Sequence, residues 1–168
     1  MSEPVRRWYA VHTRPHAEAR ALENLERQGF QAWLPLYRKQ RRHAGRSEQV
    51  LRPLFSRYLF VALDLGGEQW RPVLSTFGVA DLVGGRDGPL PLADEVMEAL
   101  RARADADGHY TLARGFKAGE RVRIEAGPMR DLEGILAVES DADRAVVMLR
   151  LFGREVRVSL SPDEIDRA

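Results

Sequence analysis

Hydrophobic and polar residues alternate along the first two thirds of the chain in a way that predicts short strands and two amphipathic helices. Strand character, with apolar, aromatic and β-branched residues, is found at residues 7–12, 30–37, 49–54, 57–63 and 79–83. Helical spacing of apolar residues predicts helices over residues 14–28 and 93–106, with a shorter one within 67–75. Thr13 and Asp94 are expected to be N-caps, and Gly29 is expected to end the first helix.

The segment 57–63 is the strongest predicted strand. Tyr58 and Phe60 lie on one face, and Leu59, Val61 and Leu63 lie on the other. A strand that is apolar on both faces is either central in a sheet or meets a partner on one face.

The last third of the chain predicts a second, smaller domain. Gly119 opens a period-2 strand, Gly127-Pro128 interrupts it, and Gly134 begins another apolar run. Short strands are expected at 120–125, 134–139, 144–151 and 154–160, with a tail at 163–167. The fold class predicted is therefore α+β, with a mixed α/β N-terminal sandwich over 1–104, a linker over 105–115 and a five-stranded SH3-like barrel over 116–168.

Composition and charge narrow the function. The chain has 168 residues and no cysteine, which excludes disulfides and thiolate metal sites, and the absence of a long apolar run or signal peptide predicts a cytoplasmic protein with no membrane contact. Residues 1–60 carry 12 basic and 5 acidic residues, whereas 61–168 carry 14 basic and 20 acidic ones. The basic half suggests one region that meets phosphate. Its cations lie on one helix face (Arg20, Arg27) and around a turn at Gly45 (Arg38 to Arg46).

Several stretches, in this order and spacing, resemble the NusG family of transcription elongation factors. The stretches are Trp8 to Thr13 before a helix, Pro53 to Val61, Thr76 to Val79, and the Gly119–Leu136 pattern, which is similar to the KOW motif. The resemblance covers about residues 7 to 167. It implies a factor without catalytic activity or cofactor, which binds the clamp helices of RNA polymerase and reduces pausing.

The resemblance also implies which residues make the contacts. The positions that match the polymerase-binding patch of the family are Phe55, Tyr58, Phe60, Met97, Leu100 and, toward the opposite side of the polymerase channel, Trp70. Ordinary core packing is the alternative for each of them.

Within the family, the chain is most similar to the specialised RfaH-type antitermination paralogues, and the general NusG factor is the alternative. The positions that match the DNA-reading surface of the RfaH branch are Arg14, Arg20, Asn24, Arg27 and Thr76. Asn24 and Phe77 depart from that branch. Phe77 is expected to be buried, and stacking on a flipped base is the alternative for its ring. Arg41 and Arg42 at the hairpin tip are expected to approach upstream DNA.

The KOW domain is expected to recruit a protein. Residues 116–168 carry 9 basic and 11 acidic residues, which argues against burial in RNA. The resemblance implies the termination factor Rho or a small-subunit ribosomal protein as the partner, with these candidate contacts: Phe116, Met129, Phe152 and Arg154. The RfaH branch can also fold this domain as a helical hairpin that masks the polymerase site. The β-branched valines here favour the barrel.

Other classes of protein are less well supported by the sequence. His12 and His16 are four residues apart, but Pro15 lies between them and no third zinc ligand is evident, so no metal site is expected. No phosphate loop or nucleophile motif is present, and the chain is expected to be a monomeric non-enzyme. A KOW-containing RNA-binding or translation accessory protein is the remaining alternative.

Overall fold

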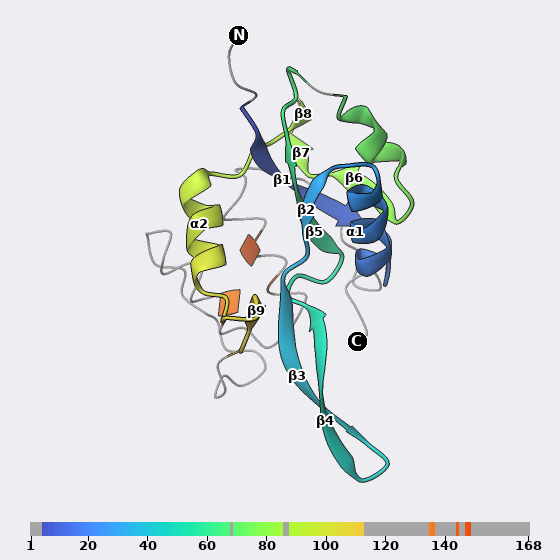
Figure 1. Cartoon of the computed structure of the whole chain (residues 1–168), viewed down its shortest axis with the longest axis vertical. Coiled ribbons are helices and arrows are strands. Elements are labelled where there is room, and N and C mark those ends of the chain that lie inside the picture. The colour runs from blue at the N-terminus through green and yellow to red at the C-terminus, as the bar shows by residue number, and fades with distance from the viewer. Residues whose placement is uncertain are drawn as a thin grey trace.

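The structure, a computed structural model, describes residues 5–67, 69–85, 88–112, 135–136, 144 and 147–148. Figure 1 shows the elements in chain order. The bounds are β1 (Arg7–Thr13), α1 (Glu18–Arg27), β2 (Gln31–Trp33), β3 (Leu36–His43), β4 (Arg46–Pro53), β5 (Tyr58–Leu63), η1 (Arg71–Ser75), β6 (Val79–Leu82), β7 (Gly84–Gly85), β8 (Gly88–Pro89), α2 (Asp94–Ala102) and β9 (His109–Tyr110).

A four-stranded antiparallel sheet forms the centre of the molecule, in the order β2-β5-β1-β6. β5 lies between β2 and β1, and all six of its residues are buried. This confirms the prediction that the strand with two apolar faces is central. Because successive side chains of a strand point to opposite faces, β5 contributes to a core on each side of the sheet.

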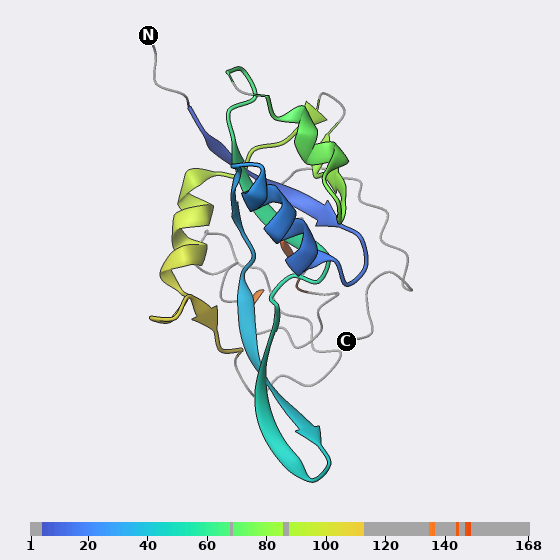
Figure 2. The same cartoon turned by 45° about the vertical axis from the view of Figure 1, so that its right-hand side comes forward.

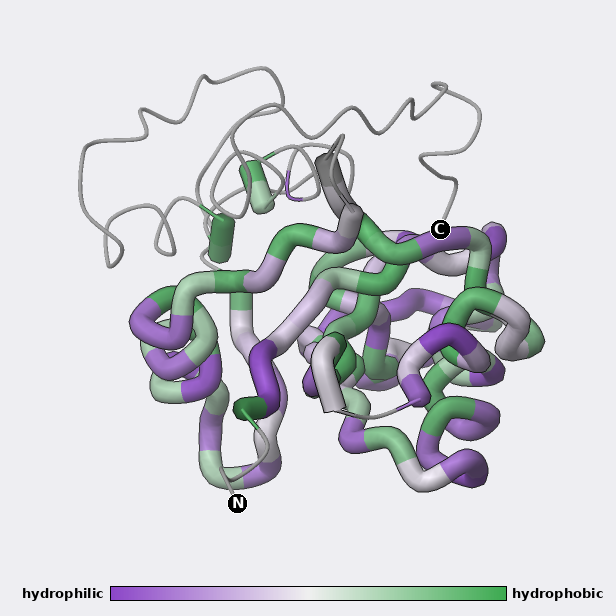
Figure 3. Tube along the Cα trace, turned by 90° about the horizontal axis from the view of Figure 1, so that it is seen from above, coloured by the Kyte–Doolittle hydropathy of each residue, from purple (hydrophilic) through white to green (hydrophobic). Residues whose placement is uncertain are grey.

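The two cores are closed by different helices. On one face, Leu59, Val61 and Leu63 pack with Ala21 and Leu25 of α1. On the other face, Tyr58 and Phe60 join a cluster that includes three residues of α2, namely Val96, Met97 and Leu100. Figure 2 shows α1 and α2 on opposite sides of the sheet, and in Figure 3 hydrophilic and hydrophobic positions alternate along both helices, as expected for amphipathic elements.

A long hairpin of β3 and β4 projects from this body (Figure 1). The strands are paired over eight positions, from Leu36 opposite Pro53 to His43 opposite Arg46. Ala44 and Gly45 both have positive φ and form the connecting two-residue turn, as the right-handed twist of the strands favours. The solvent-exposed basic tip predicted from the sequence is confirmed over residues 39–46, whereas Arg38 is half-buried and the return strand begins at Arg46 and not at residue 49.

Local structure differs from the sequence prediction at the start of α1. The helix begins at Glu18 and not at residue 14, and Thr13 is the last residue of β1 and not a cap. Thr13 N–H donates to the Arg57 carbonyl oxygen at 2.8 Å, and Thr13 pairs with Val79 of β6, so this residue belongs to the sheet and lies before the helix begins. The Glu18 carboxylate turns inward and accepts a bond from the Arg57 backbone N–H at 2.9 Å.

Three other boundaries also shift. The single strand predicted over 30–37 is two strands, β2 and β3, separated at Leu34-Pro35, because proline lacks the N–H that a continuous ladder requires. The expected helix within 67–75 is a five-residue 3₁₀ helix, with Pro72 in its first turn. Asp94 begins α2 after Ala93, which makes no side-chain cap.

The C-terminal third is described at only five positions, and all five are helical. Ile135 and Leu136 lie within one predicted strand, and Arg144, Val147 and Met148 lie within another, so the prediction of strands is wrong at these residues. Arg144, Val147 and Met148 have the spacing of one helix face and all three are buried. The rest of the predicted barrel lies outside the described residues, as do Phe116, Met129, Phe152 and Arg154.

The linker predicted over residues 105–115 contains a short strand, β9, in its described part. β9 pairs in parallel with β3, Leu36 opposite His109 and Tyr37 opposite Tyr110. The Tyr110 ring is buried, and its hydroxyl donates to the Leu100 carbonyl oxygen of α2. Burial raises the pKa of the Tyr110 hydroxyl, which therefore stays protonated and keeps this bond. The domain boundaries stay a prediction.

Gly78 sets the distance between the β6 turn and α1. Its φ is +94°, and a Cβ atom built there would lie 3.0 Å from the Ala21 backbone nitrogen and 3.1 Å from the Ala17 carbonyl oxygen. Both contacts are with helix backbone, which cannot move aside as the end of a flexible side chain can. A side chain here would force the turn and α1 apart and would strain the backbone at this positive φ.

We expect Gly78→Ala to lower the free energy of unfolding by more than about 1 kcal/mol, since it adds a backbone contact to the strain of positive φ. Urea unfolding measures the loss. Gly29→Ala is the matched control, because Gly29 has φ +91° and open space around its Cβ position. Equal losses for the two variants would show that the close approach to α1 contributes nothing.

Candidate functional site

The structure brings together five of the six residues predicted to bind polymerase. Phe55, Tyr58, Phe60, Met97 and Leu100 belong to one cluster on the α2 side of the sheet. The rings of Phe55 and Phe60 meet edge to face with centroids 5.9 Å apart. The ring centroids of Trp33 and Phe60 are 5.7 Å apart. All five residues are buried, so this face is not exposed in the structure as it stands.

Part of the cover over this face comes from the C-terminal segment. Ile135, Val147 and Met148 are buried members of the same cluster as Tyr58 and Phe60. These residues are at least 70 positions away from β5 in sequence, so the contact joins two segments that are far apart in the chain. The face that the sequence predicted to meet a partner therefore meets this chain's own C-terminal segment.

Arg144 makes polar interactions where the C-terminal segment contacts the N-terminal part of the chain. Its Nε donates to the Leu54 carbonyl oxygen at 2.7 Å, and its guanidinium carbon lies 4.7 Å from the centre of the Tyr37 ring. Burial lowers the pKa of Arg144, and Tyr37 partly opposes this effect. Arginine remains charged even so, and a buried cation needs directed partners of this kind. Sequence reasoning missed Arg144, which directly precedes the apolar run 145–149.

Trp70 is not brought to the same place. It is half-buried and packs against the cluster on the α1 side of the sheet, away from the other five residues. This agrees with ordinary packing, the alternative that the sequence left open for this side chain.

A second candidate surface lies along α1. Arg20, Asn24 and Gln28 follow one another at four-residue spacing, and the Gln28 amide donates to the Thr76 hydroxyl at 2.8 Å. Thr76 is buried and donates to the Pro72 carbonyl oxygen, so its hydroxyl is engaged within the fold. Gln28 was missed by sequence reasoning, although it continues the spacing of Arg20 and Asn24.

The other residues predicted to contact DNA are exposed to solvent, but they differ in whether their side chains are bonded within the fold. Arg14 is exposed just after β1, and its backbone N–H donates to the Gly78 carbonyl oxygen at 2.8 Å. Arg27 is exposed but bonds Glu23 one turn earlier on the helix at 2.9 Å. Arg41 and Arg42 are exposed on the hairpin, with Arg41 opposite Glu48, and form a basic surface separate from α1.

Phe77 contradicts the expectation that it is buried. Its side chain is 69% exposed, and the Arg20 guanidinium carbon lies 5.2 Å from the ring centre. The turn at Gly78 is held too close to α1 to leave room for the ring beneath it, so the ring points outward.

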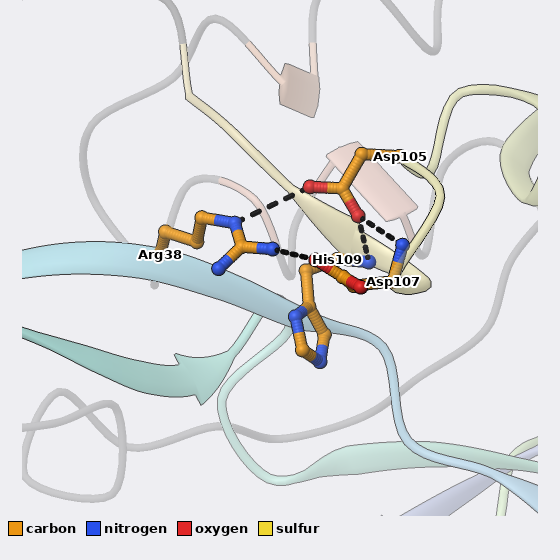
Figure 4. Close-up of polar contacts among 4 residues, drawn as sticks. All are labelled: Arg38, Asp105, Asp107 and His109. Carbon is orange, nitrogen blue, oxygen red and sulfur yellow. Dashed lines mark hydrogen bonds and ion pairs between the residues drawn. The ribbon is translucent and has the colours of Figure 1, made fainter.

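A polar clamp ties the base of the hairpin to the loop after α2 (Figure 4). Arg38 Nε lies 3.2 Å from Asp105 Oδ2, and Arg38 Nη2 lies 2.8 Å from Asp107 Oδ2. The other Asp105 oxygen accepts the backbone N–H groups of Asp107 and His109. These two backbone bonds and Arg38 together hold the pKa of Asp105 below its usual range, with the bond from His109 the largest cause. The clamp leaves Arg41 and Arg42, but not Arg38, available to a ligand.

Among the described residues, no group of three or more His, Asp or Glu side chains is arranged to hold a metal ion. Among the same residues, no helix has the length and apolar character needed to cross a membrane.

Comparison with known proteins identifies the family. The profile described as "Transcription termination factor nusG" matches residues 6–101. The chain is 30% identical over 180 residues to the "Transcription termination/antitermination protein NusG" of Thermus thermophilus, covering 96% of this chain and 98% of that protein. It is 31% identical over 184 residues to the protein of the same name from Staphylococcus carnosus, covering 99% and 100%. The chain therefore belongs to the NusG family.

A solved structure is also similar. It is described as "Domain interaction in Thermotoga maritima NusG", has 26% sequence identity to this chain and a TM-score of 0.45, and covers 74% of this chain and 75% of that chain.

We expect Arg38→Gln to raise the pKa of Asp105 only part of the way to its ordinary value, because the backbone bonds from His109 and Asp107 remain. Since the folded-state pKa is depressed, the stabilisation from this carboxylate is present above its unfolded pKa and is lost as the pH falls through the folded value. Carboxyl NMR titration measures the shift. A complete return to the ordinary value would show that Arg38, and not the loop backbone, controls this group.

Proposed function

We propose that this protein is a non-catalytic transcription elongation factor that binds RNA polymerase through the apolar face formed by β5 and α2. The observation that carries the proposal is the gathering of Phe55, Tyr58, Phe60, Met97 and Leu100 in one cluster. Relatives that align over nearly the whole chain are named transcription termination/antitermination proteins, which supports a role in elongation and termination. A clustered aromatic and aliphatic face is also the kind of surface that supplies most of the binding energy at protein interfaces.

The proposal requires the C-terminal segment to leave this face before polymerase binds. Ile135, Val147 and Met148 occupy the position that a partner would take. A protein whose binding-competent form is only a fraction of the population binds more weakly by that fraction. The C-terminal segment would therefore set the apparent affinity for polymerase.

The branch within the family is open to two proposals. The general factor is supported by the names of the curated relatives, and in it the C-terminal segment would form a KOW barrel that recruits Rho or a small-subunit ribosomal protein. A specialised antitermination factor of the RfaH type is favoured by one observation, the helical C-terminal residues on the polymerase-binding face. Chromosomal occupancy separates them: the general factor would occupy most transcribed genes, and the specialised one a few operons.

The nucleic-acid contact is proposed for the α1 surface and for the hairpin tip. Arg14 and Arg20 are exposed near the turn at Thr76, and Arg41 and Arg42 are exposed on β3. Arginines in such positions attract phosphate in a salt-dependent manner. We propose the non-template strand as the ligand of the first surface and upstream duplex DNA as the ligand of the second.

Release of the C-terminal segment is expected to strengthen polymerase binding. Met148→Asp places a charge in a fully buried apolar position, which favours detachment of the segment. We expect the apparent Kd for purified RNA polymerase to fall by about tenfold or more, as the binding-competent fraction rises. Fluorescence anisotropy of labelled protein measures it.

Leu74→Asp is the matched control, because Leu74 is 42% exposed on η1 and does not belong to the β5–α2 cluster. Its affinity for polymerase should equal that of the unchanged protein. If Met148→Asp binds polymerase no better than this control, the segment is not a mask. Circular dichroism of both variants checks that the N-terminal domain stays folded.

The two α1 arginines are expected to differ in their effect on DNA binding. On a scaffold with an exposed non-template strand, Arg20→Gln should weaken binding and reduce the slope of log K against log salt by about 0.7, the value for one single-strand phosphate contact. Arg27→Gln should do less, because this guanidinium already bonds Glu23. Unchanged affinity in the double variant would refute the contact.

A further inference from the structure

The turn over residues 55–58, which leads into β5, is buried and strained. The Tyr58 N–H donates to the Phe55 carbonyl oxygen at 3.0 Å and closes the turn. Arg57, its third residue, has φ +71°, a conformation in which glycine or asparagine is usual. The two other described non-glycine residues with positive φ are exposed, whereas Arg57 is buried. Strain of this kind persists only where the surrounding structure holds it, and it is concentrated at functional sites.

Hydrogen bonds to two other elements hold Arg57 in this conformation. The Glu18 carboxylate, at the start of α1, accepts the Arg57 backbone N–H at 2.9 Å. Thr13, at the end of β1, donates its N–H to the Arg57 carbonyl oxygen at 2.8 Å, and its own carbonyl oxygen accepts a bond from Arg57 Nε at 3.2 Å. The backbone is therefore fixed on both sides of the strained dihedral angle, and the bond to the carboxylate is the charge-assisted one.

Glu18 is a buried carboxylate whose bond stabilises the turn. Its residue is 8% exposed, and it lies where β1 ends and β5 begins. Burial of a carboxylate costs free energy that hydrogen bonds have to offset. The bond to Arg57 is made to the main chain, so it holds the turn whichever side chain stands at this position. Without an acceptor, this buried N–H would be unsatisfied, and the turn would lose a contact that offsets its strain.

The turn sets the positions of two aromatic rings of the polymerase-binding face. Phe55 and Tyr58 are its first and last residues, and both are buried in the β5–α2 cluster. The Tyr58 ring stacks on His12 with centroids 5.2 Å apart, and the Phe55 ring meets Phe60 edge to face. Relaxation of φ at Arg57 would turn the backbone between the two rings and change their spacing.

We propose that Glu18 and Arg57 are positioning residues for polymerase binding, in which the carboxylate holds the strained turn and the turn holds Phe55 and Tyr58 in the arrangement that the partner contacts. The inference rests on the proposed polymerase contact and deepens it by adding residues that act through those two rings. α1, which covers the opposite face of the sheet, thereby contributes to the polymerase-binding face. A face that is already ordered binds more tightly than one that has to be ordered on binding.

The test measures the affinity of the full chain for purified RNA polymerase. All variants carry Met148→Asp, so that a weakened turn cannot act by releasing the C-terminal segment. Glu18→Ala should weaken binding about tenfold, because the fraction of molecules with an ordered face falls. Glu18→Gln should retain the affinity, since its amide oxygen can accept the same N–H.

Two control variants separate this effect from general ones. Val73→Ala removes buried apolar volume from the cluster on the α1 side and controls for loss of stability, which urea unfolding measures. Glu23→Ala removes an exposed carboxylate from α1 and controls for loss of charge. Both should bind polymerase as the Met148→Asp protein does.

Variants of Arg57 separate the backbone conformation from the side chain, and they test the proposal even where Glu18→Ala does not fold. Arg57→Gly loses the bond from Nε to Thr13 but adopts positive φ without strain. Arg57→Ala loses the same bond and keeps the strain. We expect Arg57→Gly to bind polymerase more tightly than Arg57→Ala, and equal affinities would contradict the proposal.

Amide NMR supplies a readout that a general loss of stability would not change. Glu18→Ala should move the Arg57 amide proton resonance upfield, because the bond to the carboxylate is lost, and Val73→Ala should leave it in place. The proposal is overturned if this resonance does not move, if Glu18→Ala binds polymerase as tightly as the Met148→Asp protein, or if Glu18→Ala and Val73→Ala weaken binding equally.

In each of those cases polymerase binding itself persists, and only the positioning role is wrong. If neither the unchanged chain nor the Met148→Asp protein binds polymerase, the proposed function is wrong and the positioning role is overturned with it.

Discussion

The burial of β5 on both of its faces is the constraint on which the rest of this structure depends. Its six residues direct alternate side chains into two separate cores, so the sheet has to be covered on both sides. α1 covers one side. α2 and residues from the C-terminal segment both pack on the other. An apolar face whose cover comes from a distant part of the chain is suited to an exchange between self-contact and partner contact.

The two sides of the sheet have different chemistry. The α2 side contains Phe55, Tyr58 and Phe60, which would stabilise a complex with a partner through the apolar area that they bury. The α1 side presents Arg20 and Phe77 at the surface, with the amides of Asn24 and Gln28 beside them. A protein contact and a nucleic-acid contact can thus be made on opposite faces of one small domain without competing for residues.

The hairpin and the chain leaving α2 are held together at the edge of this arrangement. β9 pairs with β3, and Arg38 bonds Asp105 and Asp107. Tyr37 at the base of the same hairpin lies under the Arg144 guanidinium. The root of the hairpin is therefore in contact with both the loop before the C-terminal segment and the segment itself, whereas the cations near its tip face solvent.

Much of the N-terminal domain follows from local pattern alone. The two apolar faces of 57–63 predicted a central strand, Gly29 predicted the end of α1, and Gly45 among polar residues predicted the hairpin turn, because each of these depends on short-range sterics or on a strict two-residue period. Motif order was also sufficient to indicate the NusG family. These features need no knowledge of distant contacts.

Other features were decided only by tertiary structure. Thr13 has the chemistry of a cap, yet its bond to Arg57, 44 residues away, and its pairing with Val79 keep it in the sheet, and the helix starts later. Phe77 has the hydrophobicity of a core residue, yet the close contact of Gly78 with α1 leaves its ring outside. Arg144, Val147 and Met148 suit a strand by composition and a helix by spacing. Contact with the β5–α2 face decides between the two, because local preferences that nearly balance are settled by the apolar surface that one of the conformations buries.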